Sequence, residues 1–350
     1  MQWVKDSIKG LKAYNTNQRP FRIKLDANEG KNILFRDIIS QGLRFEEDFY
    51  INYYPDNDAA KLREELGNYV GVNHENIMVG NGSSELIELV IKTFVDKGET
   101  IMSFVPSFSM YQIFSQIHSA RFAGVERNED FTVDIDLLIK RAKEINPKLI
   151  LLCNPNNPTG SLIDKKDIKK LLENTDSLVV VDEAYIEFAE SSIAREALKY
   201  NNLIVLRTLS KALGLAAIRL GYAIACDEII EVLNCVRVPY NLNAITQYIG
   251  VLALKNKEKI HDYVEEVKKE REFLYDELSK LPFTVYKSYA NFVLIKSDIE
   301  DLAEKLEAQG ILIRSFSGDM KQYYRITVGD RSENLELIKS LKEIVNDEKK

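Results

Sequence analysis

Short apolar runs alternate with segments of helical periodicity between residues 76 and 225. Seven apolar runs have the length of buried strands: 76–80, 100–104, 120–125, 148–153, 177–182, 202–206 and 219–225. Helical periodicity lies between most of them: 83–95, 108–117, 134–145, 164–174 and 193–200. Short apolar strands separated by helices form a parallel sheet with helices on both faces. The sequence therefore predicts an α/β fold around a mostly parallel central sheet.

The pattern changes after about residue 243. A long helical stretch is followed by shorter strand-like runs and two further helices, which is typical of a separate, smaller α+β domain. The chain of 350 residues is long enough for two domains. We expect an N-terminal arm at 1–30, a large α/β domain at 31–245 and a small C-terminal domain at 246–350. Part of the N-terminal segment is expected to join the small domain, and a helix is expected at 32–44.

The composition excludes several classes of protein. The net charge is −7 and no basic stripe is present, so nucleic acid is not an expected partner. No apolar run reaches the length of a membrane span or of a signal peptide core, so no membrane partner is expected. The three cysteines are scattered, which favours unpaired thiols in the cytoplasm. The three histidines lack metal-ligand spacing, so no metal site is expected.

A lysine follows one of the most apolar strands of the chain. The segment RTLSKALGLAAIRLG, 207–221, places Lys211 between a strand end and a stretch rich in alanine and glycine. Burial near such backbone favours the neutral amine, which is the nucleophile that forms a Schiff base with an aldehyde. Thr208, Ser210 and Arg219 are close enough in sequence to hold an anion beside it. The alternative is a basic turn with a surface lysine.

Further polar segments follow other strands, where ligands of open parallel sheets bind. GNGSSE, 80–85, opens a helix, and its N–H groups with the hydroxyls of Ser83 and Ser84 are suited to a phosphate. A plain helix cap is the alternative. NPNNPTG, 154–160, has two Asn-Pro pairs that favour extended backbone, which would point Asn157 at a ligand. Its alternative is a proline-rich surface loop.

A third segment, VVVDEAYIEF at 179–188, places Asp182 at the end of a buried strand and Tyr185 three residues later. A buried aspartate needs a cationic partner, and a protonated heteroaromatic nitrogen would serve as well as a structural salt bridge. Together with the lysine and the anion-binding groups, these residues match the needs of pyridoxal phosphate. An aromatic ring should stack on the cofactor. We expect Tyr111 in that place, with Phe108 as the alternative stacking residue and core packing as the alternative role.

These motifs resemble those of the fold-type I pyridoxal-phosphate-dependent aminotransferases. More closely, they are similar to the histidinol-phosphate aminotransferases of histidine biosynthesis. The resemblance covers nearly the whole chain and includes segments outside the three central motifs: LDANEG, NYYPD, GNGSSELIE, NFVLIK, ILIRSF and YYRITVGD.

The resemblance implies a role for each matching position. Lys211 is expected to be the catalytic lysine that bonds to the cofactor. The expected cofactor-binding residues are Ser83, Ser84, Tyr111, Asn157, Asp182, Tyr185, Thr208, Ser210 and Arg219, with Tyr54 contributed by the neighbouring subunit of a homodimer. Among them, Tyr185 and Asn157 are expected to bond the hydroxyl of the cofactor ring. The expected substrate-binding residues are Arg325, which would grip an anionic group, and Tyr14, Asn28 and Arg314.

The implied reaction is a ping-pong transfer of an amino group between histidinol phosphate and 2-oxoglutarate. Three departures from the family pattern bear on the substrate: Gly30-Lys31-Asn32 after the Asn-Glu pair, Ser83-Ser84 in the phosphate loop, and LGLAAIR after the lysine. Threonine-phosphate decarboxylases and aromatic aminotransferases share the scaffold and remain alternatives. A cofactor-sensing regulator would need a DNA-binding domain, for which the N-terminal arm is too short.

Overall fold

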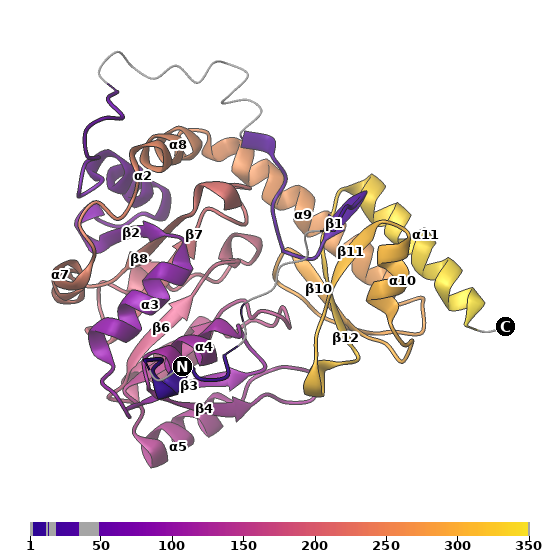
Figure 1. Cartoon of the computed structure of the whole chain (residues 1–350), viewed down its shortest axis with the longest axis horizontal. Coiled ribbons are helices and arrows are strands. Elements are labelled where there is room, and N and C mark those ends of the chain that lie inside the picture. The colour runs from indigo at the N-terminus through magenta and orange to yellow at the C-terminus, as the bar shows by residue number, and fades with distance from the viewer. Residues whose placement is uncertain (1–2, 12, 14–18, 35–48, 349–350) are drawn as a thin grey trace.

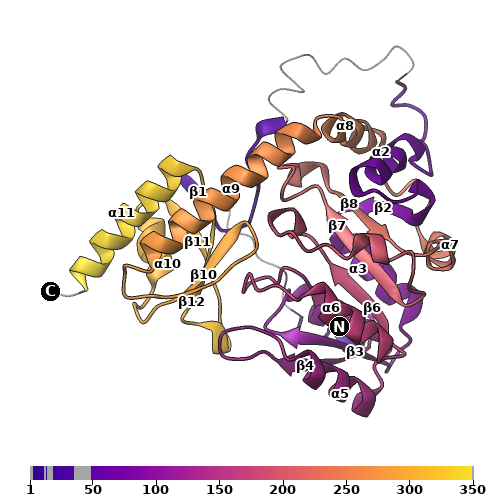
Figure 2. The ribbon, with the colours of Figure 1, turned by 180° about the vertical axis from the view of Figure 1, so that it is seen from behind.

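The structure, a computed structural model of the 350-residue chain, describes residues 3–11, 13, 19–34 and 49–348. Two lobes, each built around one β-sheet, are joined by a long helix (Figures 1 and 2). The strands are β1 Ile23–Leu25, β2 Ile77–Asn81, β3 Thr100–Val105, β4 Arg121–Glu126, β5 Leu149–Cys153, β6 Leu178–Asp182, β7 Leu203–Thr208, β8 Leu220–Ile224, β9 Thr284–Tyr286, β10 Phe292–Lys296, β11 Ile311–Ser315 and β12 Tyr323–Thr327. The α-helices are α2 Ala60–Val70, α3 Ser83–Phe94, α4 Met110–Ile117, α5 Ile135–Ile145, α6 Lys165–Glu173, α7 Asp227–Val236, α8 Ala244–Leu254, α9 Lys257–Leu278, α10 Leu302–Ala308 and α11 Arg331–Asp347.

The larger sheet has seven strands in the order β2-β8-β7-β6-β5-β3-β4. All of them run in one direction except β8, which is antiparallel to both of its neighbours. Side chains of each central strand alternate between two buried clusters, so β5 contributes Ile150 to one face and Leu151 to the other. One face packs against α3, α4 and α7, and the opposite face packs against α5 and α6. The expected α/β class with a covered, mostly parallel sheet is confirmed.

The smaller sheet has five strands in the order β1-β11-β12-β10-β9. Its first strand, β1, comes from the N-terminal segment and pairs in parallel with β11, while the other pairings are antiparallel. Helix α11 begins with a capping box, in which the Asp330 carboxylate accepts from the Glu333 N–H and the Glu333 carboxylate accepts from the Asp330 N–H. Because β1 precedes the large sheet in sequence, the chain passes from the small lobe to the large lobe after β1 and returns to the small lobe through α9.

Two helical expectations differ from the structure. At 193–200 the structure has a 3-10 turn, Ala194–Glu196, in place of the expected α-helix. The Glu183 carboxylate accepts a hydrogen bond from the N–H of Ile193, and the Ser192 hydroxyl accepts one from the N–H of Ala194, so side chains compete with helical hydrogen bonding here. The helical stretch after residue 243 breaks into α8, which packs against α2, and α9, which packs against α11. The helix expected at 32–44 lies mostly outside the described residues. Within the described part of the chain, no helix has the length and apolarity needed to cross a membrane.

Candidate active site

Several loops converge at one edge of the large sheet. Strands β2, β5, β6 and β7 run in the same direction, so their carboxyl ends meet at this edge. Asp182 is the last residue of β6 and pairs in register with Cys153, the last residue of β5. Thr208 ends β7, three residues before Lys211. The edge therefore collects the motifs that follow four different strands, as expected for an open parallel sheet.

Asp182 is a buried acid with two hydrogen-bond donors. Its Oδ2 accepts from the hydroxyl of Tyr111 at 3.1 Å, and its Oδ1 accepts from the N–H of Ala184 at 3.2 Å. Burial dominates over these donors and raises the pKa of Asp182 to about 6. At neutral pH it is a buried carboxylate that two neutral donors only partly compensate, and a cationic ligand would complete its environment.

The amine of Lys211 lies in the same site, close enough to act on the charge of Asp182. Its Nζ donates to the carbonyl oxygen of Ala27 at 3.1 Å and lies 5.7 Å from the centre of the Tyr185 ring. Burial, followed by the positive charge of Arg325, lowers the pKa of Lys211 to about 7. A large share of the amine is therefore neutral at physiological pH, which is what a nucleophilic or proton-transferring lysine requires.

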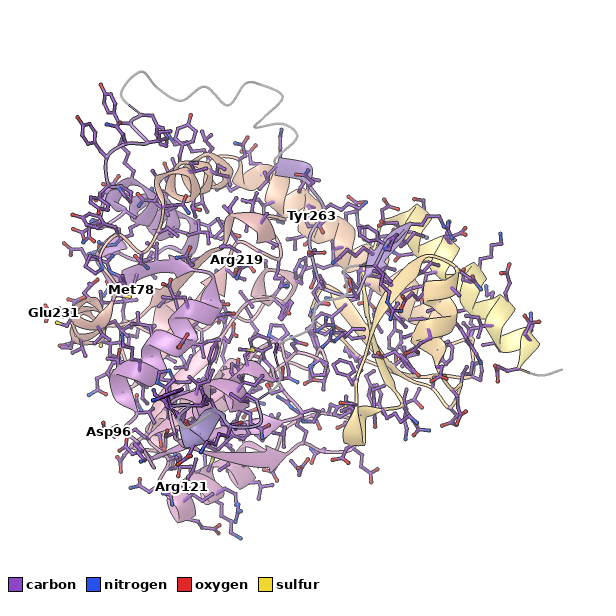
Figure 3. All side chains as sticks on the ribbon, in the orientation of Figure 1. Met78, Asp96, Arg121, Arg219, Glu231 and Tyr263 are labelled. Carbon is purple, nitrogen blue, oxygen red and sulfur yellow. The ribbon has the colours of Figure 1, made fainter. Side chains whose placement is uncertain are left out.

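An anion cradle forms where α3 begins. Figure 3 shows Arg219 beside α3, and a Cβ added to Gly82 would lie 2.5 Å from its Nη2. Arg219 adopts the left-handed conformation at φ 55°, and Gly221 lets β8 approach the N–H of Ser83 closely. The N–H groups of the first turn of α3 and one guanidinium therefore lie together, and these groups suit a phosphate. Ser84 occupies the second position of that helix.

Thr208 and Ser210 lie on the loop that leads from β7 to the lysine. The Thr208 hydroxyl donates to the Ser210 hydroxyl at 2.9 Å and accepts from the Ser210 N–H at 3.1 Å. Both side chains are buried. This local network fixes the loop so that Lys211 follows it in a defined direction.

Four of the expected residues form two hydrogen-bonded pairs where the two lobes meet, Asn28 with Tyr185 and Arg325 with Asn157. Asn28 is buried, and its side-chain amide donates to the Tyr185 hydroxyl at 3.1 Å. Arg325, on β12, donates from Nη1 to Oδ1 of Asn157 at 2.6 Å and from Nη2 to the carbonyl oxygen of Asp26 at 2.7 Å. The residues expected to bond the ring hydroxyl and the arginine expected to bind the substrate therefore lie at one place, although they are far apart in the sequence.

The remaining expected residues are Arg314, Tyr54 and Tyr14. Arg314 on β11 is the direct cross-strand partner of Arg325, which places two guanidinium groups on one face of the small sheet. Tyr54 is 79% exposed, and its ring stacks on that of Tyr240 with a centroid separation of 4.5 Å. Tyr14 lies outside the described residues.

The structure gives Tyr111 a contact that the sequence did not suggest. Its ring is 1% exposed and its hydroxyl is bound to Asp182, while Phe108 meets it edge-on at 5.7 Å and is partly exposed. Sequence reasoning also missed Ala27, because a backbone carbonyl leaves no side-chain signal. Stacking of Tyr111 on a cofactor ring stays a prediction.

The residues present fit pyridoxal phosphate. The cradle at Gly82 and Arg219 suits its phosphate, the buried carboxylate of Asp182 suits its protonated ring nitrogen, and the near-neutral amine of Lys211 suits its aldehyde. Tyr185 receives its hydrogen bond from Asn28, which leaves the phenolic proton for a ring oxygen.

Comparisons with known proteins give the same picture. Residues 22–341 match the family described as aminotransferase class I and II. The chain is 41% identical over 338 residues to the histidinol-phosphate aminotransferase of Clostridium novyi, which covers 96% of this chain and 95% of that protein. Its fold is similar to the crystal structure of the histidinol-phosphate aminotransferase from Clostridium acetobutylicum, with a TM-score of 0.84 and 28% identity over 93% of this chain and 99% of that one.

A further structure, the histidinol-phosphate aminotransferase of Sinorhizobium meliloti in complex with pyridoxal-5'-phosphate, has a TM-score of 0.88. It covers 99% of this chain and 98% of that one, and at 20% identity it supports the fold alone. The family match and the Clostridium novyi relative each extend over most of the chain. On this evidence the chain belongs to the aminotransferase class I and II family and is a pyridoxal-phosphate-dependent aminotransferase of fold type I.

Proposed function

We propose that this enzyme transfers an amino group between histidinol phosphate and 2-oxoglutarate, giving imidazole acetol phosphate and glutamate, with the reaction being reversible. One observation carries the proposal: Lys211, whose pKa is lowered to about 7, and Arg325, which is expected to bind the substrate, lie in the same site. The substrate itself is suggested by the relative at 41% identity and by the motifs that match the histidinol-phosphate type.

Lys211 is the group that moves protons in this proposal. When bound, pyridoxal phosphate supplies an aldehyde and an electron-withdrawing ring. With a pKa of about 7, the Nζ of Lys211 can accept a proton from the substrate Cα and return it in a later step. Asp182 is a buried acid whose negative charge would keep the ring nitrogen of the bound cofactor protonated.

The substrate is held from the small lobe. Arg325 presents a guanidinium fork that is suited to the carboxylate of glutamate or to a phosphate. Its contact with Asn157 fixes the fork next to the residue expected at the ring hydroxyl, so one substrate anion and the cofactor ring are placed together. Arg314, the neighbouring strand residue, adds a second positive charge that favours doubly charged substrates.

Phe108 is the better candidate for the stacking ring in this proposal. It is partly exposed, whereas Tyr111 is buried and donates to Asp182. Tyr111 would then act on the cofactor indirectly, by holding the carboxylate of Asp182 in place.

We also propose that the enzyme is a homodimer and that Tyr54 of each subunit completes the phosphate cradle of the other. We propose the cytoplasm as its location. The side chain of Tyr54 is exposed and stacked on Tyr240, so its ring is accessible to a neighbouring subunit. Mixing K211A subunits with Y54A subunits tests this arrangement. Half of the dimers are then hybrids with one intact site, so about a quarter of wild-type activity should return. Absence of recovery, with mixed dimers shown by mass, would contradict the arrangement.

The substrate is tested by direct assay. Purified enzyme is supplied with histidinol phosphate and 2-oxoglutarate, and glutamate is measured, while threonine phosphate and aromatic amino acids are run in parallel. We expect glutamate formation with histidinol phosphate to be the fastest reaction and to be abolished in K211A. Release of carbon dioxide from threonine phosphate without a glutamate-dependent half-reaction would overturn the proposal in favour of a decarboxylase.

A further inference from the structure

One short segment of the chain, residues 26–28, contacts three of the residues assigned to the reaction. The carbonyl oxygen of Asp26 accepts from Arg325, and that of Ala27 accepts from Lys211. Asn28, the next residue, donates to Tyr185. The position of residues 26–28 therefore sets the distance between the substrate arginine, the lysine and the ring-hydroxyl tyrosine.

This segment continues into a close backbone contact with the lysine loop. A side chain on Gly30 would collide with the carbonyl oxygen of Lys211, and a side chain on Gly214 would collide with that of Lys31. Gly214 also has φ 65°, a conformation that favours glycine. The two backbones therefore touch, and any displacement of residues 30–31 moves the loop that carries the lysine.

The segment is held at both ends. At its start, β1 pairs with β11 in the small sheet. At its end, the N–H of Lys31 donates to the hydroxyl of Tyr263 on α9 at 3.0 Å. The side chain of Lys31 then reaches across to the N-terminus of α11, where its Nζ lies 3.0 Å from Oδ2 of Asp330 and 3.8 Å from Oε1 of Glu266.

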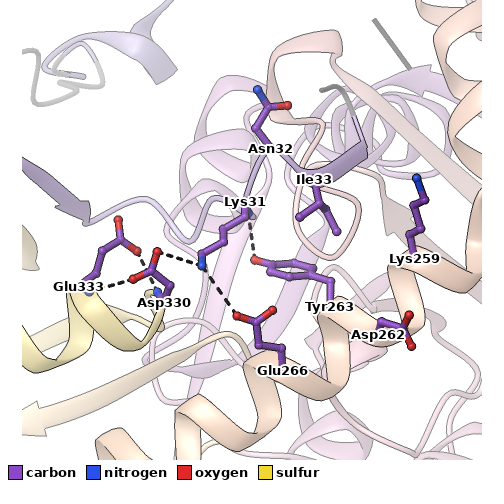
Figure 4. Close-up of a pocket in the computed structure, with 9 residues that line it drawn as sticks. All are labelled: Lys31, Asn32, Ile33, Lys259, Asp262, Tyr263, Glu266, Asp330 and Glu333. Carbon is purple, nitrogen blue, oxygen red and sulfur yellow. Dashed lines mark hydrogen bonds and ion pairs between the residues drawn. The ribbon is translucent and has the colours of Figure 1, made fainter. Parts of the chain in front are cut away.

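Figure 4 shows these groups among the residues that line a pocket. The volume of the pocket is about 740 Å³. Lys31 extends between the helix α9, which carries Tyr263 and Glu266, and the start of α11. Burial acts against ionisation of Asp330, but hydrogen bonds from Ser332 and the Glu333 N–H, together with Lys31, hold its pKa well below the ordinary value. Asp330 is therefore a permanent anion at physiological pH.

We propose that Lys31 is a positioning residue: its ammonium, paired with Asp330 and Glu266, presses the segment 26–31 against the loop of Lys211 and so fixes the place of the lysine amine. The inference deepens the proposed function, on which it rests, because the group being placed is the one assigned to proton transfer. It also gives a role to Gly30-Lys31, which departs from the family pattern.

The alternative is a surface ion pair that stabilises the fold and nothing else. The Lys31 and Asp330 side chains are 35% and 34% exposed, so their attraction is partly screened. A structural pair would change the melting temperature alone. A positioning pair would also change the exchange of nearby amides and the protonation of the lysine-bound cofactor.

The test uses the cofactor-loaded enzyme and the substitution K31M, which removes the charge and keeps the apolar stem. Three quantities are measured: hydrogen exchange of a peptide containing residues 24–33, the midpoint of the pH-dependent change in the visible absorbance of the bound cofactor, and kcat/KM. We expect faster hydrogen exchange of this peptide. We also expect the midpoint to move to higher pH, because water that enters the loosened site favours the protonated form of the nitrogen that joins Lys211 to the cofactor. We expect kcat/KM to fall by about three- to fivefold, the size set by a partly exposed ion pair.

Two further variants separate positioning from folding. D330N removes the charge but keeps an asparagine, which is a good N-cap, so α11 is preserved. It should give the same changes as K31M, and the double variant should add little to either. K31R restores the charge and should recover exchange and midpoint.

K259M is the matched control, since Lys259 lines the same hollow from α9. It should leave exchange and midpoint unchanged. The proposal is overturned if K31M exchanges and titrates like the wild type, or if K259M has an equal effect. Failure of the wild-type enzyme to use histidinol phosphate would contradict the proposed substrate instead, since exchange and absorbance need no substrate.

Discussion

Replacing Asp182 with asparagine should stabilise the cofactor-free protein and weaken its response to the cofactor. The carboxylate is buried, and among the residues that the structure describes its hydrogen-bond donors are Tyr111 and Ala184. Asparagine has nearly the same shape. Its side-chain oxygen can still accept from Ala184, and its amide can donate to the oxygen of Tyr111. The substitution therefore removes a charge and leaves the packing intact.

The magnitude follows from the pKa of Asp182. Burial raises it from 3.8 to about 6, so the folded state binds the proton more tightly than the unfolded state. The free energy of unfolding of the wild type therefore falls as pH rises from about 4 to about 6 and is level above that range. A shift of about two units corresponds to roughly 3 kcal/mol. D182N lacks this loss, so at pH 8 it should be more stable by roughly that amount.

The assay is thermal unfolding of both proteins without cofactor at pH 8 and at pH 4. With an unfolding entropy near 2.1 cal/mol/K per residue, 3 kcal/mol moves the melting temperature of a chain of this length by about 4 °C. At pH 4 the difference should shrink to about half a kcal/mol, because the wild-type carboxyl is then protonated in the folded state. Added pyridoxal phosphate should raise the melting temperature of the wild type more than that of D182N, because only the wild type has a charge facing the ring nitrogen.

Asp176 provides a matched control, since it is an exposed aspartate on the loop before the same strand. D176N should not reproduce the gain at pH 8. The reasoning is refuted if D182N without cofactor is less stable than the wild type at pH 8, or if the difference between them is equal at the two pH values. Either result would mean that the carboxylate is well solvated or well paired in the folded enzyme.

Two other substitutions test the phosphate cradle and the junction of the lobes. G82A places a methyl group 2.5 Å from Nη2 of Arg219 and should weaken cofactor binding about tenfold in an absorbance titration, whereas G98A, with a similar positive φ and open space around it, should not. Phe131 has φ 64° and packs against Tyr323 on β12, the strand that carries Arg325. The substitution F131A should raise the KM for glutamate, measured by steady-state kinetics. It should also lower the free energy of unfolding by about 3 kcal/mol, measured by urea unfolding. An unchanged KM in F131A would show that the ring does not hold that strand in place.

The fold class could be predicted because the signals for it are local. All seven expected strands of the large sheet are present, since apolar runs between helical segments leave few other ways to bury both faces. The orientation of β8 could not be predicted. It runs antiparallel between β2 and β7 because the segment from Lys211 to Arg219 turns the chain back without a crossover helix, and sequence period says nothing about strand direction.

The candidate site divides in the same way. Lys211 and Asp182 could be found because each follows a strongly apolar strand, where a charged side chain needs a reason to be buried. Their partners could not be found. The contact of Asn157 with Arg325 spans 168 residues, and that of Lys211 with Ala27 spans 184. The pKa of Lys211 is lowered by burial and by the charge of Arg325, so it could not be predicted before the tertiary structure was known.

By itself, the sequence predicted which residues could react and at which edge of the sheet they would lie. Strand periodicity and the chemistry of side chains are properties of neighbouring residues, and they survive without knowledge of the rest of the chain. Only the tertiary structure decided that the segment 26–31 lies between the two lobes and touches the reacting groups. Its contacts are made mainly by backbone carbonyls and glycines, which any sequence contains, and they acquire meaning only when distant parts of the chain are packed against each other.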